Sequence, residues 1–114
     1  VRGIPCIYYG DEIGFKGKKE EGDSALRMPM VEPEGEWPAG GRELYASICA
    51  LIKMRRDFPA LQYGKMLTLY FQNNEFIFAR ATEGNQQVMI VCVNIEGQEH
   101  KNVEVELAPL QLPP

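Results

Sequence analysis

The sequence predicts an α+β fold, mainly β, in which a βα unit over residues 1–58 precedes an all-β region over residues 59–114. Three observations lead to this prediction. An unbroken apolar run stands near the start of the chain, a helical period occupies its middle, and a period of two runs through its second half. With 45% apolar residues among 114, the chain can build a modest core.

The first predicted element is a strand over residues 4–9, which Gly10 ends. Its apolar residues are continuous rather than alternating, which is typical of a strand covered on both faces in a parallel sheet. A single strand of this kind leaves its backbone groups and both faces without partners. We therefore expect residues 1–58 to be the last unit of a larger α/β domain. We also expect the unpaired strand to favour self-association into a homo-oligomer.

A long loop and a helix follow. Residues 10–41 hold most of the glycines and show no clear period, and loops of this length are usually functional or disordered. The spacing i, i+4, i+7, i+8 then predicts an amphipathic helix over residues 42–57 with one apolar face, made of Leu44, Ile48, Leu51 and Ile52. Pro59 ends this helix.

Four strands are predicted in the second half of the chain. Residues 66–71 and 76–81 flank Asn73-Asn74 and read as a hairpin. Residues 88–93 are apolar on both faces, as in a central strand, and residues 103–107 alternate, as in a half-exposed strand. Turns are predicted at residues 83–85 and at Gly97. The expected architecture is an antiparallel sheet or a small sandwich.

Composition excludes several classes of function. The net charge is −4 and the basic residues are scattered, which argues against nucleic acid as a partner, because binding to phosphates needs a basic face. No apolar run approaches the ~20 residues of a membrane span, so no membrane partner is expected. His100, the only histidine, lies in a polar turn, so no His-based metal site or triad and no cofactor are expected.

The three cysteines, Cys6, Cys49 and Cys92, lie far apart, and each lies in an apolar segment. Their spacing fits neither a zinc site nor a redox motif. We expect free, buried thiols that act as small hydrophobic side chains. Free thiols favour a reducing compartment and hence the cytoplasm.

Three segments carry a resemblance to a known family. "GIPCIYYGDEIG" at residues 3–14 resembles the eighth-strand segment of the α-amylase superfamily, glycoside hydrolase family 13. "GDSALRMPM" at residues 22–30 and "RELYASICALIKMRRDFPALQYG" at residues 42–64 resemble the family's following loop and last barrel helix, in the same order. The β-rich remainder is similar to domain C of the family. The long loop most resembles the group of neopullulanases, cyclomaltodextrinases and maltogenic amylases.

The resemblance implies a retaining α-glycosidase that acts on α-1,4 or α-1,6 bonds of α-glucan oligosaccharides. Its (β/α)₈ barrel needs ~250 residues. The chain is therefore expected to be a C-terminal fragment, with the end of the barrel at residues 1–58 and domain C at residues 59–114. The family's three catalytic carboxylates would lie upstream of Val1, so the fragment is expected to be structural, with no catalytic residue of its own.

Neither Asp11 nor Glu12 replaces the missing pair. Retaining enzymes place two carboxylates ~5–5.5 Å apart across one sugar bond, whereas neighbours in an extended segment point to opposite sides. Glu12 is better interpreted as a structural hydrogen-bonding residue. Tyr8 and Tyr9 are interpreted as packing residues, with at most one hydroxyl reaching the barrel mouth for the same reason.

Asp23 and Arg27 are the candidate substrate-binding residues. They match the Asp and Arg that line donor-side sugar subsites in this group, and both side chains make charge-assisted hydrogen bonds to hydroxyls. The alternative is an ordinary exposed ion pair. The chain departs from the family's usual residues at Ala25, Leu26 and Glu32, which affects the details of this subsite.

Trp37 is either a sugar-stacking platform or a packing anchor, and the anchor is favoured. Two alternative functions stay open. The β region could be a non-enzymatic carbohydrate-binding module, although its aromatic residues Tyr70, Phe71, Phe76 and Phe78 are better placed as core. The longer protein could instead have another family 13 specificity, that of an oligo-1,6-glucosidase or a trehalose-forming enzyme.

Overall fold

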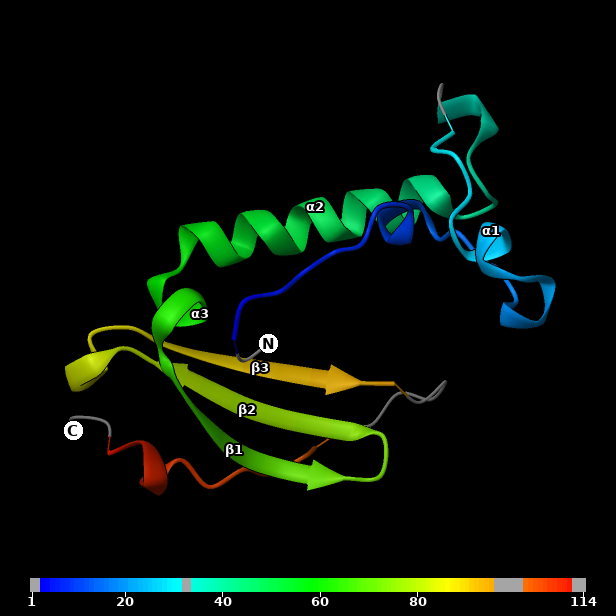
Figure 1. Cartoon of the computed structure of the whole chain (residues 1–114). Coiled ribbons are helices and arrows are strands. Elements are labelled where there is room, and N and C mark those ends of the chain that lie inside the picture. Colours follow the sequence, from blue (N-terminus) through cyan, green and yellow to red (C-terminus); the bar gives the residue numbers. More distant parts are fainter. Residues whose placement is uncertain (1–2, 32–33, 96–101, 112–114) are drawn as a thin grey trace. The chain divides into compact units, whose positions relative to one another are not determined.

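The structure is a computed structural model that describes residues 3–31, 34–95 and 102–111 (Figure 1). The chain divides into two compact units, Val1–Lys53 and Met54–Pro114. The fold is mixed α+β, with helices followed by a three-stranded antiparallel sheet. The domain assignment of residues 1–58 and 59–114 stays a prediction.

The first unit contains short helical turns and most of one long helix. The turns are η1 (Asp11–Ile13), η2 (Lys19–Glu21), α1 (Asp23–Leu26) and η3 (Glu34–Glu36). Helix α2 (Gly41–Asp57) confirms the predicted helix and continues into the second unit. Its start lies against η1, because a Cβ at Gly41 would be 2.9 Å from the carbonyl oxygen of the fully buried Ile13.

The predicted strand at residues 4–9 is not present. This segment has no regular secondary structure, and Ile4 is 95% exposed. A strand exists only where a neighbour accepts its backbone hydrogen bonds, and none of the described residues pairs with this segment. Its apolar composition therefore does not produce a strand here. Self-association through it stays a prediction.

The second unit holds the sheet, formed by β1 (Lys65–Gln72), β2 (Glu75–Ala81) and β3 (Val88–Asn94) in the order β1-β2-β3. The predicted hairpin is confirmed, with Gln72 opposite Glu75 and Asn73 in the left-handed region at φ 47°. The central strand is β2, not the apolar segment 88–93. Its middle residues, 77–80, are all buried, whereas Ile90 and Val93 of β3 remain exposed.

The predicted fourth strand is also absent. Residues 102–107 have no regular structure, although Val103 and Val105 are half-buried between exposed neighbours, as the alternation predicted. The sheet therefore has three strands among the described residues, and the fold is not mainly β. The predicted turn at Gly97 and the position of His100 lie outside the described residues.

A short helix, α3 (Pro59–Tyr63), joins α2 to the sheet, and the sequence patterns did not predict it. Pro59 ends α2 and at the same time supplies a preset φ for the first turn of α3. The guanidinium of Arg55 donates to the carbonyls of Leu61 and Gln62, which fixes the corner between the two helices. The core of this unit consists of Ala60, Ile77, Phe78, Ala79, Arg80 and Leu110.

The state of the three cysteines differs from the one expected. All three cysteines are free but exposed, so the prediction of buried thiols is wrong. The apolar runs that contain them lack covering elements among the described residues, and Leu51 of α2 is likewise 62% exposed.

Within residues 3–31, 34–95 and 102–111, no helix combines the length and apolarity needed to cross a membrane.

Candidate functional site

Asp23 and Arg27 lie at the two ends of α1, in the first unit. Gly22, at φ 90°, starts the helix in a conformation that favours glycine, and Arg27 follows its last turn. The i, i+4 spacing brings the two side chains together, with 3.6 Å between Asp23 Oδ2 and Arg27 Nη1. The side chains are 74% and 65% exposed, respectively, so the pair faces solvent and is open to a ligand.

A close backbone approach holds this part of the loop. A Cβ at Gly17 would lie only 2.1 Å from the carbonyl oxygen of Ala25, so no larger residue fits at this position without movement of the backbone. The amide of Gly22 also donates to the carbonyl of Lys19 at 3.0 Å. These contacts close residues 17–26 into a compact loop that presents Asp23 and Arg27. Glu32, one of the departures from the family pattern, lies outside the described residues.

The first unit also contains a pair of neighbouring tyrosines. The rings of Tyr8 and Tyr9 lie 4.7 Å apart at 43°, and both are about half exposed. Partial removal from water raises the pKa of Tyr9, and Tyr8 raises it further, whereas the nearby charge of Arg27 lowers it. The expected alternation of these side chains is wrong, because the segment is not a strand. The two rings therefore form an exposed aromatic pair in the first unit.

Asp11 and Glu12 serve the local backbone. Asp11 Oδ2 accepts a hydrogen bond from the amide of Tyr8 at 3.2 Å, and Glu12 Oε2 accepts one from the amide of Gly10 at 2.8 Å. Gly10 itself has φ 91°, which starts the turn η1. Both carboxylates thus stabilise the turn after residue 9, as the sequence predicted for Glu12.

Trp37 is held as a packing residue. Its Nε1 donates to the carbonyl of Val31 at 3.0 Å, and its ring lies 5.3 Å from that of Tyr45 at 53°. The side chain is half-buried. The hydrogen bond, the ring contact and the partial burial all favour the packing anchor over a free stacking platform. A hollow of about 430 Å³ opens in the same unit, with Phe15, Met28 and Val31 among its lining residues.

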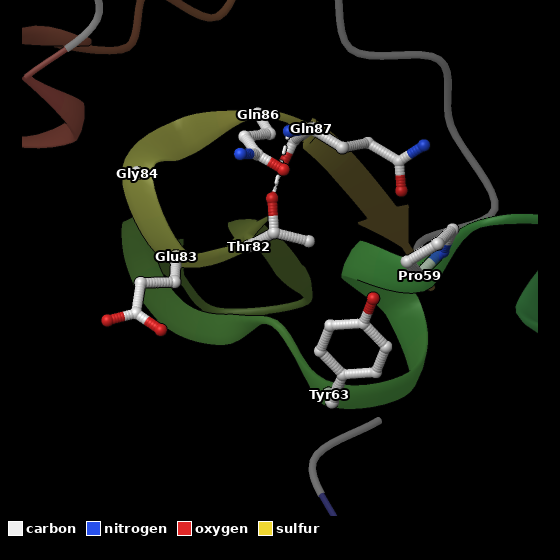
Figure 2. A pocket seen from close by; sticks show the side chains of 7 residues that line it. All are labelled: Pro59, Tyr63, Thr82, Glu83, Gly84, Gln86 and Gln87. Carbon is white, nitrogen blue, oxygen red and sulfur yellow. Dashed lines mark hydrogen bonds between the residues drawn. The ribbon is translucent and has the colours of Figure 1, made fainter.

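The second unit contains a separate hollow of about 650 Å³, between α3 and the turn before β3 (Figure 2). We call it the Tyr63 hollow; its lining residues include Pro59, Tyr63, Thr82, Glu83, Gln86 and Gln87. Sequence reasoning missed this site, since it treated residues 83–85 only as a turn. A tyrosine after "FPALQ" was the one available signal in the sequence.

Among the described residues, no group of three or more His, Cys, Asp or Glu side chains is arranged to hold a metal ion. The first unit instead offers an exposed ion pair of one anion and one cation, and an exposed pair of phenol rings. Such groups bind polar, uncharged ligands through hydrogen bonds and ring contacts.

No family model matches the chain. Comparison with curated proteins finds a cyclomaltodextrinase of Geobacillus thermopakistaniensis, 39% identical over 92 residues, which are 78% of this chain and 14% of that enzyme. A cyclomaltodextrinase of Thermoanaerobacter pseudethanolicus is 34% identical over 97 residues, 85% of the chain and 16% of the enzyme. Neopullulanase 2 of Thermoactinomyces vulgaris is 35% identical over 94 residues, 81% of the chain and 15% of the enzyme.

The similarity covers most of this chain but only a small part of each relative, since the chain spans 14–16% of their length. A maltogenic α-amylase of Bacillus acidopullulyticus shows the same partial match, at 30% identity over 92 residues. The chain is therefore a partial homologue of the cyclomaltodextrinases, neopullulanases and maltogenic amylases of glycoside hydrolase family 13.

Proposed function

We propose that this chain is the C-terminal part of a retaining, α-glucan-acting glycoside hydrolase. In this proposal residues 1–58 complete the (β/α)₈ barrel, residues 59–114 form domain C, and the chain itself is structural rather than catalytic. The observation that carries the proposal is the 39% identity to a cyclomaltodextrinase over 78% of the chain. The longer protein would cleave or transfer α-1,4 or α-1,6 glucosidic bonds.

Asp23 and Arg27 are the proposed contacts to the sugar. An exposed ion pair contributes only about 0–1 kcal/mol to stability, so opening it to admit a ligand costs little. The carboxylate accepts hydrogen bonds from sugar hydroxyls and the guanidinium donates to them, with the added strength of a charged partner. The exposed rings of Tyr8 and Tyr9, in the same unit, are proposed to offer an apolar surface to the C–H face of a sugar.

In the longer protein, Arg27→Ala is expected to raise the KM for maltoheptaose or β-cyclodextrin about tenfold, the loss of one charge-assisted hydrogen bond. Asp23→Ala should have a similar effect. The Tm should move by less than about 3 °C, because both side chains face solvent. Steady-state kinetics and thermal unfolding measure the two effects.

Lys19→Ala and Glu20→Ala, in the neighbouring turn η2, are matched controls: both residues are charged and exposed in the same loop. They should leave KM unchanged. Arg27→Lys should fall between wild type and Arg27→Ala, because it keeps the charge but loses the planar pair of donors. Equal KM values for Arg27→Ala and wild type would reduce the pair to an ordinary surface ion pair.

The 114-residue chain alone is expected to release no reducing sugar from pullulan or maltotriose. Its adjacent carboxylates, Asp11 and Glu12, are engaged by backbone amides two or three residues away and do not face each other across a ligand. A reducing-sugar assay on the purified chain tests this. Hydrolysis that Glu12→Gln abolishes would contradict it, since that loss would identify Glu12 as a catalytic group.

One observation favours the alternative of a carbohydrate-binding β module. The sequence placed Phe71 in the core, yet its side chain is 73% exposed, and that of Tyr63 is 72% exposed. Exposed aromatic rings are what such a module requires. Calorimetric titration of the chain with maltoheptaose, together with assays of the longer protein, separates a binding module from part of an enzyme. Assays on isomaltose and maltose would identify an oligo-1,6-glucosidase or a trehalose-forming enzyme.

The cytoplasm remains the proposed compartment. All three thiols are free and exposed, a state that a reducing environment preserves.

A further inference from the structure

We propose that the Tyr63 hollow is an accessory carbohydrate site, separate from Asp23 and Arg27, that binds a short neutral oligosaccharide. The choice of an α-glucan as its natural ligand rests on the proposed function. The site itself is inferred from three features of the second unit: the hydrogen-bonded walls of the hollow, the exposed ring of Tyr63 and the polar groups of the lining.

The frame of the hollow is built from two elements that hydrogen bonds tie together. The amide of Ala60, in α3, donates to Gln87 Oε1 at 2.9 Å. The turn opposite is closed by Thr82, whose amide donates to the carbonyl of Gln87 at 3.0 Å and whose Oγ1 accepts from the amide of Gln87 at 2.9 Å. Because both walls are fixed before any ligand arrives, little ordering is needed on binding.

A further hydrogen bond attaches the turn to the core of the unit. Asn85, at φ 53°, donates from its side-chain amide to the carbonyl of Leu110 at 2.8 Å. Leu110 is itself buried, so this bond attaches the turn to the core of the unit. The turn is therefore positioned by three separate hydrogen-bonded contacts, although it is a surface loop.

The ligand-facing groups are a ring and several uncommitted polar atoms. The Tyr63 side chain is 72% exposed, and in Figure 2 its hydroxyl points toward the space between Thr82 and Pro59. Within the described part of the chain, the side chains of Tyr63, Glu83 and Gln86 form no hydrogen bond to another residue. A ring face and free hydroxyl, amide and carboxylate groups are the features that contact a sugar's C–H face and its hydroxyls.

The charge of the lining selects the class of ligand. Among the lining residues Glu83 is the only charged one, and no Lys or Arg is present. Phosphates and other anions would meet this carboxylate without a cation to offset it, so they are disfavoured. The volume of about 650 Å³ lies within the ~300–1,000 Å³ typical of small-molecule sites. A neutral polyhydroxylated ligand fits both the charge and the size.

The test is a titration of the ¹⁵N-labelled 114-residue chain with maltoheptaose, followed by amide chemical shifts. Shifts are expected at residues 60–63 and 82–87. Tyr63→Ala should weaken this binding at least about tenfold, because it removes the ring contact. Tyr63→Phe should keep most of the affinity, since it retains the ring. Gln86→Ala removes a second lining side chain without altering α3 and should also weaken the binding.

Phe71→Ala is the matched control, because Phe71 is as exposed as Tyr63 but does not line the hollow. It should leave the affinity of the hollow unchanged. Loss with Tyr63→Ala but not with Phe71→Ala supports the site. Shifts confined to residues near Asp23 and Arg27, or no shifts at all, would overturn it. An equal response to cellohexaose would contradict the choice of an α-glucan as the natural ligand.

Two separate measurements keep the two proposals apart. Activity of the longer protein on α-glucans tests the proposed function and does not depend on Tyr63. Binding at the Tyr63 hollow by a chain whose longer form lacks that activity would support the accessory site and contradict the proposed function.

Discussion

Gly64→Ala is expected to lower the free energy of unfolding of the second unit by about 3 kcal/mol. Gly64 lies between α3 and β1, at φ −59° and ψ 147°, a conformation that any residue adopts. Space is what restricts the position. A Cβ would lie 2.4 Å from the carbonyl oxygen of Ala60 and 2.9 Å from that of Ala81. Both are backbone atoms, so α3 and the end of β2 would have to separate.

The consequences would extend to a buried charge. Arg80 is 3% exposed, and its Nε donates to the carbonyl of Gly64 at 2.9 Å. A shift at Gly64 would lengthen this bond, and weakening the hydrogen bond of a buried cation is costly. Amide hydrogen exchange in β2 is the appropriate measurement. Tryptophan fluorescence would not report on the sheet, because the only tryptophan, Trp37, lies in the first unit.

Gly84→Ala is the comparison for this effect. Gly84 has φ 67° and open space around it, so an added methyl group meets no atom within 4 Å. Its expected cost is about 1 kcal/mol, the strain of a left-handed conformation alone. Equal losses for the two variants would contradict the prediction, because they would show that the close approach at Gly64 costs no more than the left-handed conformation at Gly84.

Phe78→Ala is expected to destabilise the sheet by about 3–5 kcal/mol, the largest loss that we expect from a single side chain. Phe78 is 7% exposed in the central strand β2, opposite Thr68 on one side and Val91 on the other. Its ring lies 5.0 Å from that of Phe76. Truncation removes this contact and leaves a cavity that the paired backbone cannot close.

Phe71→Ala serves as the control, since it removes the same side chain from the edge strand β1. Phe71 also contacts Phe76, at 5.8 Å and in an edge-on arrangement, but it is 73% exposed. Its loss should cost less than about 1 kcal/mol. Urea denaturation of both variants, followed by far-ultraviolet circular dichroism, gives the difference. Similar values would mean that burial of Phe78 contributes no more than the ring contact both residues share.

Elements that depend on local chemistry could be predicted from the sequence. The apolar period over residues 42–57 and Pro59 define α2, and Asn73-Asn74 between two strand patterns defines the hairpin. These succeed because the helix period is a property of neighbouring residues and Asn tolerates the left-handed region. The family motifs could be identified for the same reason, since each is a short, contiguous stretch.

What each segment pairs with was decided only by the tertiary structure. The apolar run at residues 4–9 and the alternating run at residues 103–107 carry strand patterns, yet neither forms a strand, because a ladder needs a partner that no local pattern supplies. Likewise β2, and not the more apolar β3, became the central strand.

The candidate sites divide in the same way. Asp23 and Arg27 could be singled out from the sequence, because they match the Asp and Arg of a short, contiguous family motif; their approach to 3.6 Å across one helical turn was shown only by the structure. The Tyr63 hollow could not, because its walls come from residues 59–63 and 82–87, which only the fold brings together. Burial was likewise decided by the tertiary structure. Phe71 and Phe78 look alike in sequence, but Phe71 is exposed on the edge strand β1, whereas Phe78 is covered in the central strand β2.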